Sequence, residues 1–434
     1  MEATTNIKKI IMGVQMLFVA FGALVLVPLL TGLDPSIALF TAGAGTLLFQ
    51  LITKSNVPVF LASSFAFIAP IQYAVKNFGV GETLGALFCA GLVYLILSAA
   101  VKIGGVETIN KYLPPIVTGP VIMVIGLKLA PVAVNMAKSF DGSGNFNNQA
   151  LAISLVSLLT AILIVIFGKK MFRLIPILGG IFVGYLFSLM LGAVDFKPIQ
   201  EAAWFALPWG PALKTGSYAI PKFDITAIFY IIPVTIAPAI EHVGDVLAIS
   251  SVTGKNFIKE PGLHRTLMGD GLATSLAGLL GGPPNTTYSE VTGAVALTRA
   301  FNPIYMRIAA VTAIVLALVG KLGAVLKTIP VPVMGGIMIL LFGMIAAIGI
   351  NSLVKAQVDM IKPKNLIIAS IILVIGIGNM VISFGNIELG GIGLAGLVGI
   401  MLNIVLPDRK EEDIETNDLN DDIGHSENNK LEIN

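Results

Sequence analysis

Charge is scarce in this chain of 434 residues: Asp, Glu, Lys and Arg together account for 12% of it, where a soluble protein has about 25%. Hydrophobic residues account for 56%, and the mean hydropathy is +0.90. Apolar runs of about 20 residues, the length that crosses the hydrocarbon of a bilayer, recur from end to end. The composition therefore excludes a soluble globular protein and predicts a polytopic membrane protein with no room for a soluble domain.

Cysteine and histidine are scarce as well. The single cysteine, Cys89, excludes a disulfide framework or a cysteine metal site within one chain, and it is most simply a small core residue. The 3 histidines are scattered, and no HExxH-type spacing occurs. An intramembrane enzyme would need a nucleophile with a base, or a metal cluster. We therefore expect no enzyme, no metal site and no cofactor.

The net charge of +2 conceals a division of the chain. Residues 407–434 hold 10 acidic and 3 basic residues, which leaves 24 basic and 15 acidic residues in 1–406. The tail has almost no large apolar residues, so we expect it to be disordered, solvated and cytoplasmic, with no assigned function. Its His425 is most simply a solvated side chain.

The apolar runs predict fourteen membrane crossings. Their ranges are 8–30, 34–53, 56–75, 83–102, 114–134, 150–168, 175–193, 224–250, 266–281, 284–300, 305–321, 330–349, 365–382 and 390–406. With a cytoplasmic N-terminus, sixteen Lys and Arg residues fall in inside loops and seven in outside loops, as the positive-inside rule requires. This places both termini in the cytoplasm. The first run is long and follows Lys8 and Lys9, so no cleavable signal peptide is expected.

The fifth and twelfth crossings are similar at a fixed offset of 217 residues. The segment "LPPIVTGPVIMVIGLKLA" matches "PVPVMGGIMILLFGMIAA" at four pairs: Pro115 with Pro332, Gly119 with Gly336, Gly126 with Gly343 and Ala130 with Ala347. One crossing begins inside and the other outside, so the two seven-segment halves are predicted to be inverted repeats. Glycine-rich packing faces also produce such matches by coincidence, and that alternative stays open.

The third and tenth crossings open with residues that are unsuited to a lipid-facing helix: "VPVFLASSFAFIAP" at 57–70 and "PPNTTYSEVTGAV" at 283–295. Backbone at membrane depth leaves the helix only where protein or a cavity satisfies it. Paired interrupted segments in corresponding positions indicate the binding site of a transporter. We expect each to be extended and then half a helix, with the positive end of the second half-helix near Ser289 and Glu290 facing a cavity.

Four carboxylates, Glu241, Asp245, Asp270 and Glu290, lie inside predicted crossings, where ionisable groups rarely face lipid. Glu241 and Asp245 are four residues apart on one helix face and would repel each other if both were charged. One of them is expected to be protonated part of the time or paired with His242. Proton-coupled transport requires such a site, which gains and loses a proton. A structural role remains the alternative for each, above all for Asp270, near a segment end, and for His242.

Two neighbouring features bear on the same region. Pro238 removes the backbone hydrogen bond to the carbonyl of Val234 and is expected to bend the helix just before Glu241. Phe65 follows the first interrupted segment. It is either a core residue or an aromatic face for a flat ligand.

These residues also carry a resemblance. "FGALVLVPLL", "PVFLASSFAFIAP", "EHVGD", "GLHRTL", "PNTTYSE", "ALTR" and "PVPVMGG" together resemble the nucleobase–ascorbate transporter family, above all its bacterial uracil permeases, in order from about residue 10 to 406. The resemblance implies an all-α fold of fourteen segments in two inverted repeats. It also implies a core domain at about 8–103 and 224–321, and a gate domain at about 114–193 and 330–406.

The resemblance further implies proton-coupled uptake of uracil, xanthine or a related base across the cell membrane. By it, Glu241 and Glu290 hydrogen-bond the base, and Phe65 and Ser289, with the adjacent Ser64 and Tyr288, line the pocket. The proton-coupling set it implies is Glu241, Asp245, Glu290 and His242. Expected partners are the nucleobase, membrane lipid and a second copy bound through the gate domain, and no nucleic acid. The coupling ion is expected to be H⁺, with Na⁺ left open.

Departures from the family pattern leave the base undecided. Uracil permeases usually have a histidine where this chain has Asp245 and a glycine where it has Ser289. They usually have an asparagine in place of Val291 and a tyrosine in place of Phe342. Many family members have Gln-His where this chain has Gln15 and Met16. The aspartates at positions 245 and 270 resemble those of the purine-transporting branch, whereas the motif "PNTTYSE" resembles that of the uracil branch. A purine-specific permease for xanthine or urate is therefore the alternative to a uracil permease.

Two further transport classes are disfavoured. An anion carrier of the sulfate-permease kind shares the expected architecture, but such proteins keep acidic side chains off the anion site and carry a cytoplasmic regulatory domain. This chain has buried carboxylates and only a short tail. A channel is disfavoured because two broken helices that meet at one site suit alternating access better than an open pore.

Overall fold

The computed structural model describes residues 2–105, 107–169, 172–384 and 387–407. Seven helices in this part of the chain are long and apolar enough to cross a membrane: Ile7–Thr31, Pro35–Ile52, Val80–Gly104, Pro115–Lys138, Asn148–Phe167, Ile225–Thr253 and Val331–Lys355. Four shorter apolar helices accompany them. The chain is therefore a mostly helical, multi-pass membrane protein. The expected acidic tail, apart from its first residue, lies outside the described residues.

The elements of the first part of the chain are α1 (Glu2–Thr31), α2 (Pro35–Ile52), β1 (Ala62–Ser63), the 3₁₀ turn η1 (Phe65–Phe67), α3 (Ile68–Asn77), α4 (Val80–Gly104), α5 (Glu107–Tyr112), α6 (Pro115–Lys138), α7 (Asn148–Phe167), η2 (Phe172–Leu174) and α8 (Pro176–Met190). Of these, α2, α6 and α8 begin at proline, and α7 follows the capping residue Asn147. Proline suits a first helical position because its missing N–H would be unbonded there in any case.

Two short helices, α9 (Lys197–Glu201) and α10 (Trp209–Thr215), lead to the second part of the chain. That part consists of α11 (Ile225–Ile231), the 3₁₀ turn η3 (Ile232–Thr235), α12 (Ile236–Thr253), the π turn η4 (Ile258–Gly262), α13 (Leu263–Leu280), β2 (Asn285–Thr286), α14 (Ser289–Thr298), α15 (Ile304–Ala317), α16 (Gly320–Lys327), α17 (Val331–Lys355), α18 (Pro363–Ile377), β3 (Val381–Phe384), β4 (Ile387–Gly390) and α19 (Gly391–Val405).

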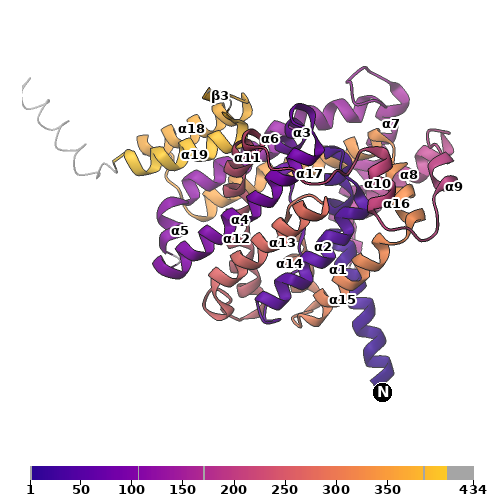
Figure 1. The fold of residues 1–434 in the computed structure, drawn as a ribbon, viewed down its shortest axis with the longest axis horizontal. Coiled ribbons are helices and arrows are strands. Elements are labelled where there is room, and N and C mark those ends of the chain that lie inside the picture. The colour runs from indigo at the N-terminus through magenta and orange to yellow at the C-terminus, as the bar shows by residue number, and fades with distance from the viewer. Residues whose placement is uncertain (1, 106, 170–171, 385–386, 408–434) are drawn as a thin grey trace, which may run out of the picture.

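Helices from the two parts of the chain pack against each other through glycines. The largest interface joins α6 to α17, and the next joins α4 to α13. A Cβ atom at Gly349 of α17 would lie 2.6 Å from the carbonyl oxygen of Gly119 of α6, so the two backbones meet directly. In Figure 1 the yellow helices α18 and α19 lie at one end of the molecule, and α8, α9 and α16 lie at the other.

The two interrupted segments meet in the interior. Strand β1 pairs antiparallel with β2, with Ala62 opposite Thr286 and Ser63 opposite Asn285. A short turn and then α3 follow β1, while α14 follows β2 and begins at Ser289. The prediction that both segments are extended and then helical is therefore confirmed.

Side chains of α2 and α13 satisfy the backbone of these buried extended segments. Thr46 accepts a hydrogen bond from the Leu61 N–H at 2.9 Å, and the Gln50 amide donates to the Val57 carbonyl at 2.9 Å. Asn285 donates to the Thr41 carbonyl at 3.0 Å, and Thr274 donates to the Asn285 carbonyl at 2.7 Å. Non-helical backbone at this depth is thus held by protein groups, as an apolar environment demands.

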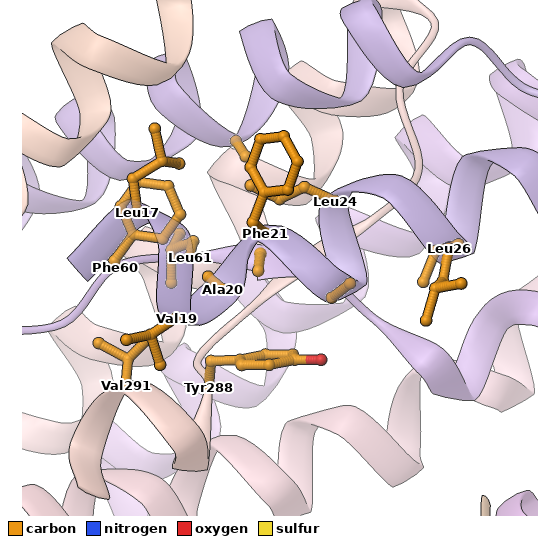
Figure 2. Close-up of a cluster of buried hydrophobic side chains, with 14 of the residues drawn as sticks. Leu17, Val19, Ala20, Phe21, Leu24, Leu26, Phe60, Leu61, Tyr288 and Val291 are labelled. Carbon is orange, nitrogen blue, oxygen red and sulfur yellow. The ribbon is translucent and has the colours of Figure 1, made fainter. Parts of the chain in front are cut away.

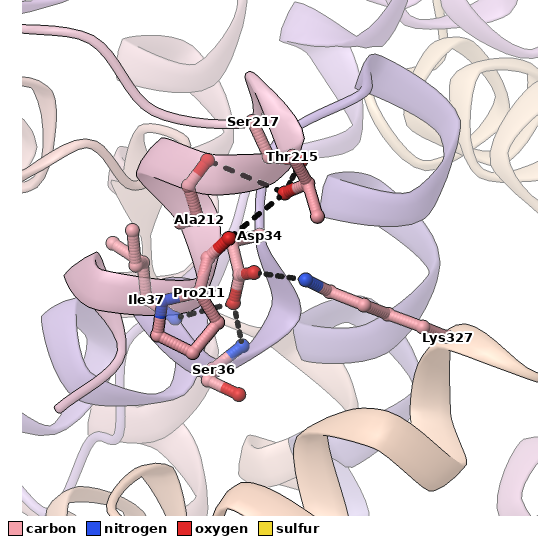
Figure 3. Close-up of polar contacts among 8 residues, drawn as sticks. All are labelled: Asp34, Ser36, Ile37, Pro211, Ala212, Thr215, Ser217 and Lys327. Atoms are coloured by element: carbon pink, nitrogen blue, oxygen red, sulfur yellow. Dashed lines mark hydrogen bonds and ion pairs between the residues drawn. The ribbon is translucent and has the colours of Figure 1, made fainter. Parts of the chain in front are cut away.

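A polar junction links the end of α16 to α2 and to α8, and Figure 3 shows its bonds at Asp34. Asp34 caps α2 by accepting hydrogen bonds from the N–H groups of Ser36 and Ile37, and its other oxygen lies 2.5 Å from Nζ of Lys327. The next residue, Thr328, shares a hydrogen bond of 2.9 Å with the hydroxyl of Tyr185 on α8. Consecutive residues are therefore bound to α2 and to α8.

Asp34→Ala should lower the stability of the protein by about 1–2 kcal/mol, because the change removes an N-cap and leaves the Lys327 ammonium without its partner. The apparent melting temperature in detergent measures this loss. Lys214→Ala, which removes an exposed lysine of α10, is the matched control and should leave the melting temperature unchanged. An Asp34→Ala protein as stable as the wild type would show that the cap contributes nothing.

Some sequence-based ranges differ from the structure. The helix expected at 365–382 ends at Ile377, and β3 begins at Val381. Gly376, Gly378 and Asn379, which has a φ of +53°, end that helix, and β-branched residues follow. Asp270 lies well inside α13 rather than near a segment end, because α13 begins at Leu263.

Candidate functional site

The acidic residues of α12 follow an irregular stretch of the same crossing. The chain turns from α11 through the 3₁₀ turn η3, which contains Pro233, before α12 begins at Ile236. The expected irregularity near Pro238 therefore begins about one turn earlier than predicted. Glu241 lies half-buried one turn into α12, and His242 and Asp245 beside it are buried.

Asp245 is bonded to the start of the second half-helix. The hydroxyl of Ser289 donates a hydrogen bond to Oδ1 of Asp245. Asp245 is 3% exposed, whereas Ser289 lies on an exposed face of α14. This bond brings together two of the site residues that the sequence predicted, from segments 44 residues apart.

His242 contacts a different carboxylate from the one expected. Its Nδ1 lies 3.4 Å from Oδ2 of Asp270 on α13, and both side chains are 0% exposed. Thr286 of β2 donates to the same oxygen at 3.4 Å. The expected pairing of His242 with Glu241 or Asp245 is therefore wrong, because the imidazole turns toward α13, where Asp270 is buried. Sequence spacing along α12 could not reveal a partner from another helix.

The aromatic residues of the two interrupted segments lie beside each other. The ring centroids of Phe65 and Tyr288 are 6.0 Å apart, with the rings tilted at 39°. Figure 2 shows Tyr288 below α1, with its hydroxyl pointing away from Val19 and Val291. Phe65 is half-buried and Ser64 is 1% exposed. The partly exposed ring of Phe65 thus lies next to the paired strands β1 and β2.

Buried polar atoms without a hydrogen-bond partner in the described chain gather on the elements that meet here. They include the hydroxyls of Ser63, Ser64, Thr287 and Tyr288, the amide nitrogen of Gln15, both ring nitrogens of His242, Oδ2 of Asp245 and Oδ1 of Asp270. An unsatisfied buried polar group costs about 1–3 kcal/mol. Such a concentration on the two broken segments and α12 is typical of a site that receives a polar ligand.

Glu290 lies at a boundary between polar and apolar surroundings. It is half-buried in the first turn of α14 and lines a cavity of about 50 Å³ between α1, α8 and α17. The other lining residues are Phe18, Val19, Val165, Ile175, Pro176, Ile177, Leu178, Ile337, Leu340, Leu341, Met344, Ile345 and Ile348. Glu290 is the one charged residue in this lining, and it borders helices from both parts of the chain.

Two glycines give the site an open side. A Cβ atom added to Gly244, next to Asp245, or to Gly293, one turn after Ser289, meets no heavy atom within 4 Å. Both glycines and the residues that follow on the same helix faces, Leu247 and Leu297, are exposed. The faces of α12 and α14 that carry these residues are therefore not covered by other described parts of the chain.

The assembled groups suit a small, flat, polar molecule. Carboxylates of Glu241 and Glu290 accept hydrogen bonds from ring N–H groups, and the free N–H groups at the start of α14 donate to a carbonyl oxygen. Phe65 offers a face for stacking. No group of three or more His, Cys, Asp or Glu side chains that could hold a metal occurs in the described residues. The arrangement can recognise and hold a ligand.

The structure also adds residues that the sequence did not single out. Gln15, Thr286 and Thr287 contribute buried polar groups to the same region. Gln15 was noted in the sequence only beside a departure from the family pattern. The two threonines stand in the quoted motif "PNTTYSE", and their adjacency to Tyr288 was the available signal.

Comparison with known proteins decides the family. Residues 7–384 match the model of the permease family that includes xanthine and uracil permeases. The chain belongs to the nucleobase–ascorbate transporter family. The prediction of a transporter rather than an intramembrane enzyme is thereby confirmed.

Relatives of this nucleobase–ascorbate transporter are similar over nearly their whole length. A probable uracil permease of Haemophilus influenzae is 53% identical over 411 residues, which cover 95% of this chain and 97% of the relative. The uracil permease of Bacillus caldolyticus is 44% identical over 93% of each chain. The uracil permease of Escherichia coli K12 is 38% identical over 93% of this chain and 92% of its own.

Solved structures share the fold at low identity. The transmembrane domain of the cyanobacterial bicarbonate transporter BicA has a TM-score of 0.60 and 15% identity, with 91% of this chain and 96% of that chain covered. SLC26A9 has a TM-score of 0.67 and 11% identity, with 92% and 65% covered. These likenesses show that the transporter has the fold of those proteins.

Proposed function

We propose that the protein imports a nucleobase, uracil or a xanthine-like purine, across the cytoplasmic membrane by proton symport. The observation that carries the proposal is the contact between α12 and α14 beside the paired strands β1 and β2. There, Ser289 bonds Asp245, and buried polar groups without a hydrogen-bond partner gather. The identity of 53% to a probable uracil permease supports a nucleobase as substrate.

In the proposed complex, Glu241 and Glu290 bind the polar edge of the base. The face of Phe65 lies against the ring, and Ser64, Tyr288 and Ser289 complete the wall from the two interrupted segments. These residues lie on the elements that the strand pairing brings together. No cofactor takes part, and the base is held by hydrogen bonds and stacking alone.

Proton coupling is assigned to the group of Glu241, Asp245, Glu290 and His242. Several carboxylates in one low-dielectric site repel one another when ionised, so binding of a proton and of a neutral base favour each other. The proton is expected to enter with the base and to leave inside. Na⁺ coupling would be revealed by uptake that depends on a sodium gradient at constant pH.

Movement is proposed to occur between a core domain, about 8–103 and 224–321, and a gate domain, about 114–193 and 330–406. The paired strands β1 and β2 and helix α12 lie within the proposed core, and α6 packs on α17 within the proposed gate. Glu290 lines a cavity between the two. Sliding of the core along the gate would carry the bound base between the two sides of the membrane.

Fourteen segments in two inverted repeats are part of the same proposal. Each of the fourteen ranges overlaps a described helix or a strand followed by a helix. The packing of helices is consistent with the repeat. The second crossing of each half packs on the fourth crossing of the other half, as α2 on α15 and α13 on α4. The sixth and seventh crossings pack on each other in both halves, as α7 on α8 and α18 on α19. Both termini are then cytoplasmic, a second copy binds through the gate, and lipid covers the remaining apolar surface.

The test is the change in melting temperature of the purified protein with uracil, xanthine, hypoxanthine or urate, together with uptake of the stabilising base into proteoliposomes with and without a proton gradient. Stabilisation by one of these bases and gradient-driven uptake would support the proposal. No stabilisation by any of them, with no uptake, would overturn it.

A purine-specific permease is the second candidate, because Asp245 and Asp270 are similar to the purine branch of the family. Stabilisation by uracil alone would identify a uracil permease that tolerates these carboxylates. Stabilisation by xanthine that is lost in Asp245→His would place the protein with the purine permeases.

A further inference from the structure

Asp245 and Ser289 form a bond between two elements that belong to different segments. The Ser289 hydroxyl donates to Oδ1 of Asp245, so the side chain of the first residue of α14 is tied to the middle of α12. Asp245 is buried and its second oxygen has no hydrogen-bond partner in the described residues. We call this bonded pair the clasp.

In the described residues, the clasp is the one side-chain hydrogen bond that joins the first turn of α14 to another element, beside the buried side chains of Tyr288 and Val291. Residues of β2 lead into α14 in an extended conformation, and the N-cap residue Tyr288 makes no side-chain hydrogen bond to the helix. The first N–H groups of a helix have no partner within the helix. A carboxylate near a helix N-terminus is favourable because it faces the positive end of the helix dipole. The clasp therefore supplies both an anchor and a stabilising charge.

Glu290 is the residue whose position depends on this anchor. It is adjacent to Ser289 in the first turn of α14 and faces the cavity that borders α8 and α17. Glu241 lies one helical turn before Asp245 on α12. A bond from Asp245 to Ser289 thus fixes the spacing between the helix turns that carry Glu241 and Glu290.

We propose that Asp245 is a positioning residue, which acts through Ser289 to hold the first turn of α14 so that Glu290 and the free N–H groups beside it face Glu241. This inference rests on the proposed function, in which Glu241 and Glu290 bind the base. It divides the acidic group into two carboxylates that contact the base and one that aligns them. The hydroxyl of Ser289 is engaged by Asp245 and does not select the base.

The transport test compares variants that break the bond with variants that keep it. Ser289→Ala and Asp245→Ala should each raise the KM for the base about tenfold. Their double variant should raise the KM no further, because both changes remove the same bond. Ser289→Thr and Asp245→Asn keep a donor and an acceptor, so each should raise the KM less than the alanine change at the same position does. Ser251→Ala, at an exposed serine of α12, is the matched control.

A second measurement tests the bond between Asp245 and Ser289 independently of transport. Amide hydrogen exchange of the full-length protein in detergent follows the first turn of α14. Ser289→Ala and Asp245→Ala should speed exchange there about tenfold, while Ser289→Thr and Ser251→Ala should leave it unchanged. Ser289→Ala is a small change at an exposed position, so this variant keeps the test decisive if Asp245→Ala does not fold.

The two measurements separate the clasp from the transport proposal. Faster exchange in a protein that takes up no nucleobase would leave the clasp in place and overturn the proposed function. Wild-type exchange and wild-type KM in Ser289→Ala would overturn the clasp, as would an Asp245→Asn protein whose exchange in the first turn of α14 is as fast as that of Asp245→Ala. A double variant with KM raised about a hundredfold would also overturn it, because independent roles would then add.

Discussion

Glu241→Ala and Glu290→Ala are each expected to reduce nucleobase uptake at least about a hundredfold. A hydrogen bond to a charged group contributes about 1.5–3 kcal/mol, and each 1.4 kcal/mol corresponds to a tenfold change. A carboxylate that accepts two N–H groups of a base therefore accounts for two or more orders of magnitude. The initial rate of uptake of the labelled base into proteoliposomes measures the effect.

The two glutamates differ in their surroundings, and their glutamine variants should reveal which of them carries the proton. Glu290 lines a cavity whose other lining residues are apolar, whereas Glu241 lies beside the buried His242 and one helical turn before the buried Asp245 on α12. Glutamine keeps one acceptor oxygen but cannot take up a proton as a carboxylate does. We expect a glutamine variant of the proton-carrying residue to bind the base and to fail to accumulate it.

A carboxylate outside the site provides the control. Glu82 at the start of α4 pairs with Lys222 at 3.3 Å. Glu82→Ala should insert and transport as the wild type does, because exposed ion pairs contribute little. Wild-type uptake by Glu241→Ala or Glu290→Ala, measured at equal amounts of inserted protein, would refute the assignment of that residue.

Gly271→Leu is expected to leave no stably folded protein, and Gly271→Ala to lower stability by about 1–3 kcal/mol. A Cβ atom at Gly271 would collide with the Cβ atom of Tyr94 and lie 2.7 Å from the carbonyl oxygen of Gly91. The approach is reciprocal, because a Cβ atom at Gly91 would collide with the backbone of α13. Backbone cannot move aside cheaply, so overpacking is costly here.

Gly293→Ala is the matched control for Gly271→Ala. Both glycines lie inside helices, but a Cβ atom at Gly293 meets no heavy atom within 4 Å. Alanine is a better helix former than glycine by about 1 kcal/mol, so Gly293→Ala should be neutral or stabilising. Thermal unfolding in detergent compares the two. Equal melting temperatures would show that α4 and α13 can separate without loss.

Much of the fold could be predicted from the sequence because hydrophobic length and proline position are local signals. The runs at 114–134 and 330–349 became α6 and α17, and the segments at 57–70 and 283–295 contain the paired strands. Strand pairing itself could not be predicted, because it joins backbone groups more than 200 positions apart. The side chains that hold the extended backbone, such as Gln50, carry no distinctive pattern.

The two interrupted segments were predicted correctly, whereas one contact of the candidate site was not. Residues near helix irregularities, Glu241 and Glu290, stand where a broken segment meets a bent one. His242 was assigned to carboxylates of its own helix, yet its ring lies against Asp270 of α13. A helical wheel gives the direction of a side chain only relative to its own axis. Which helix lies in that direction is decided by tertiary packing.

The junction at Lys327 and Thr328 has a mechanical consequence. Two adjacent Cα atoms are about 3.8 Å apart, yet one side chain is bound to Asp34 and the next to Tyr185. If those two residues belong to bodies that move relative to each other, the junction is a fulcrum where displacement is nearly zero. Displacement then grows with distance from it, as along a lever. A pair of spectroscopic labels beside the junction would therefore serve as the fixed reference against which motion near Glu290 is measured.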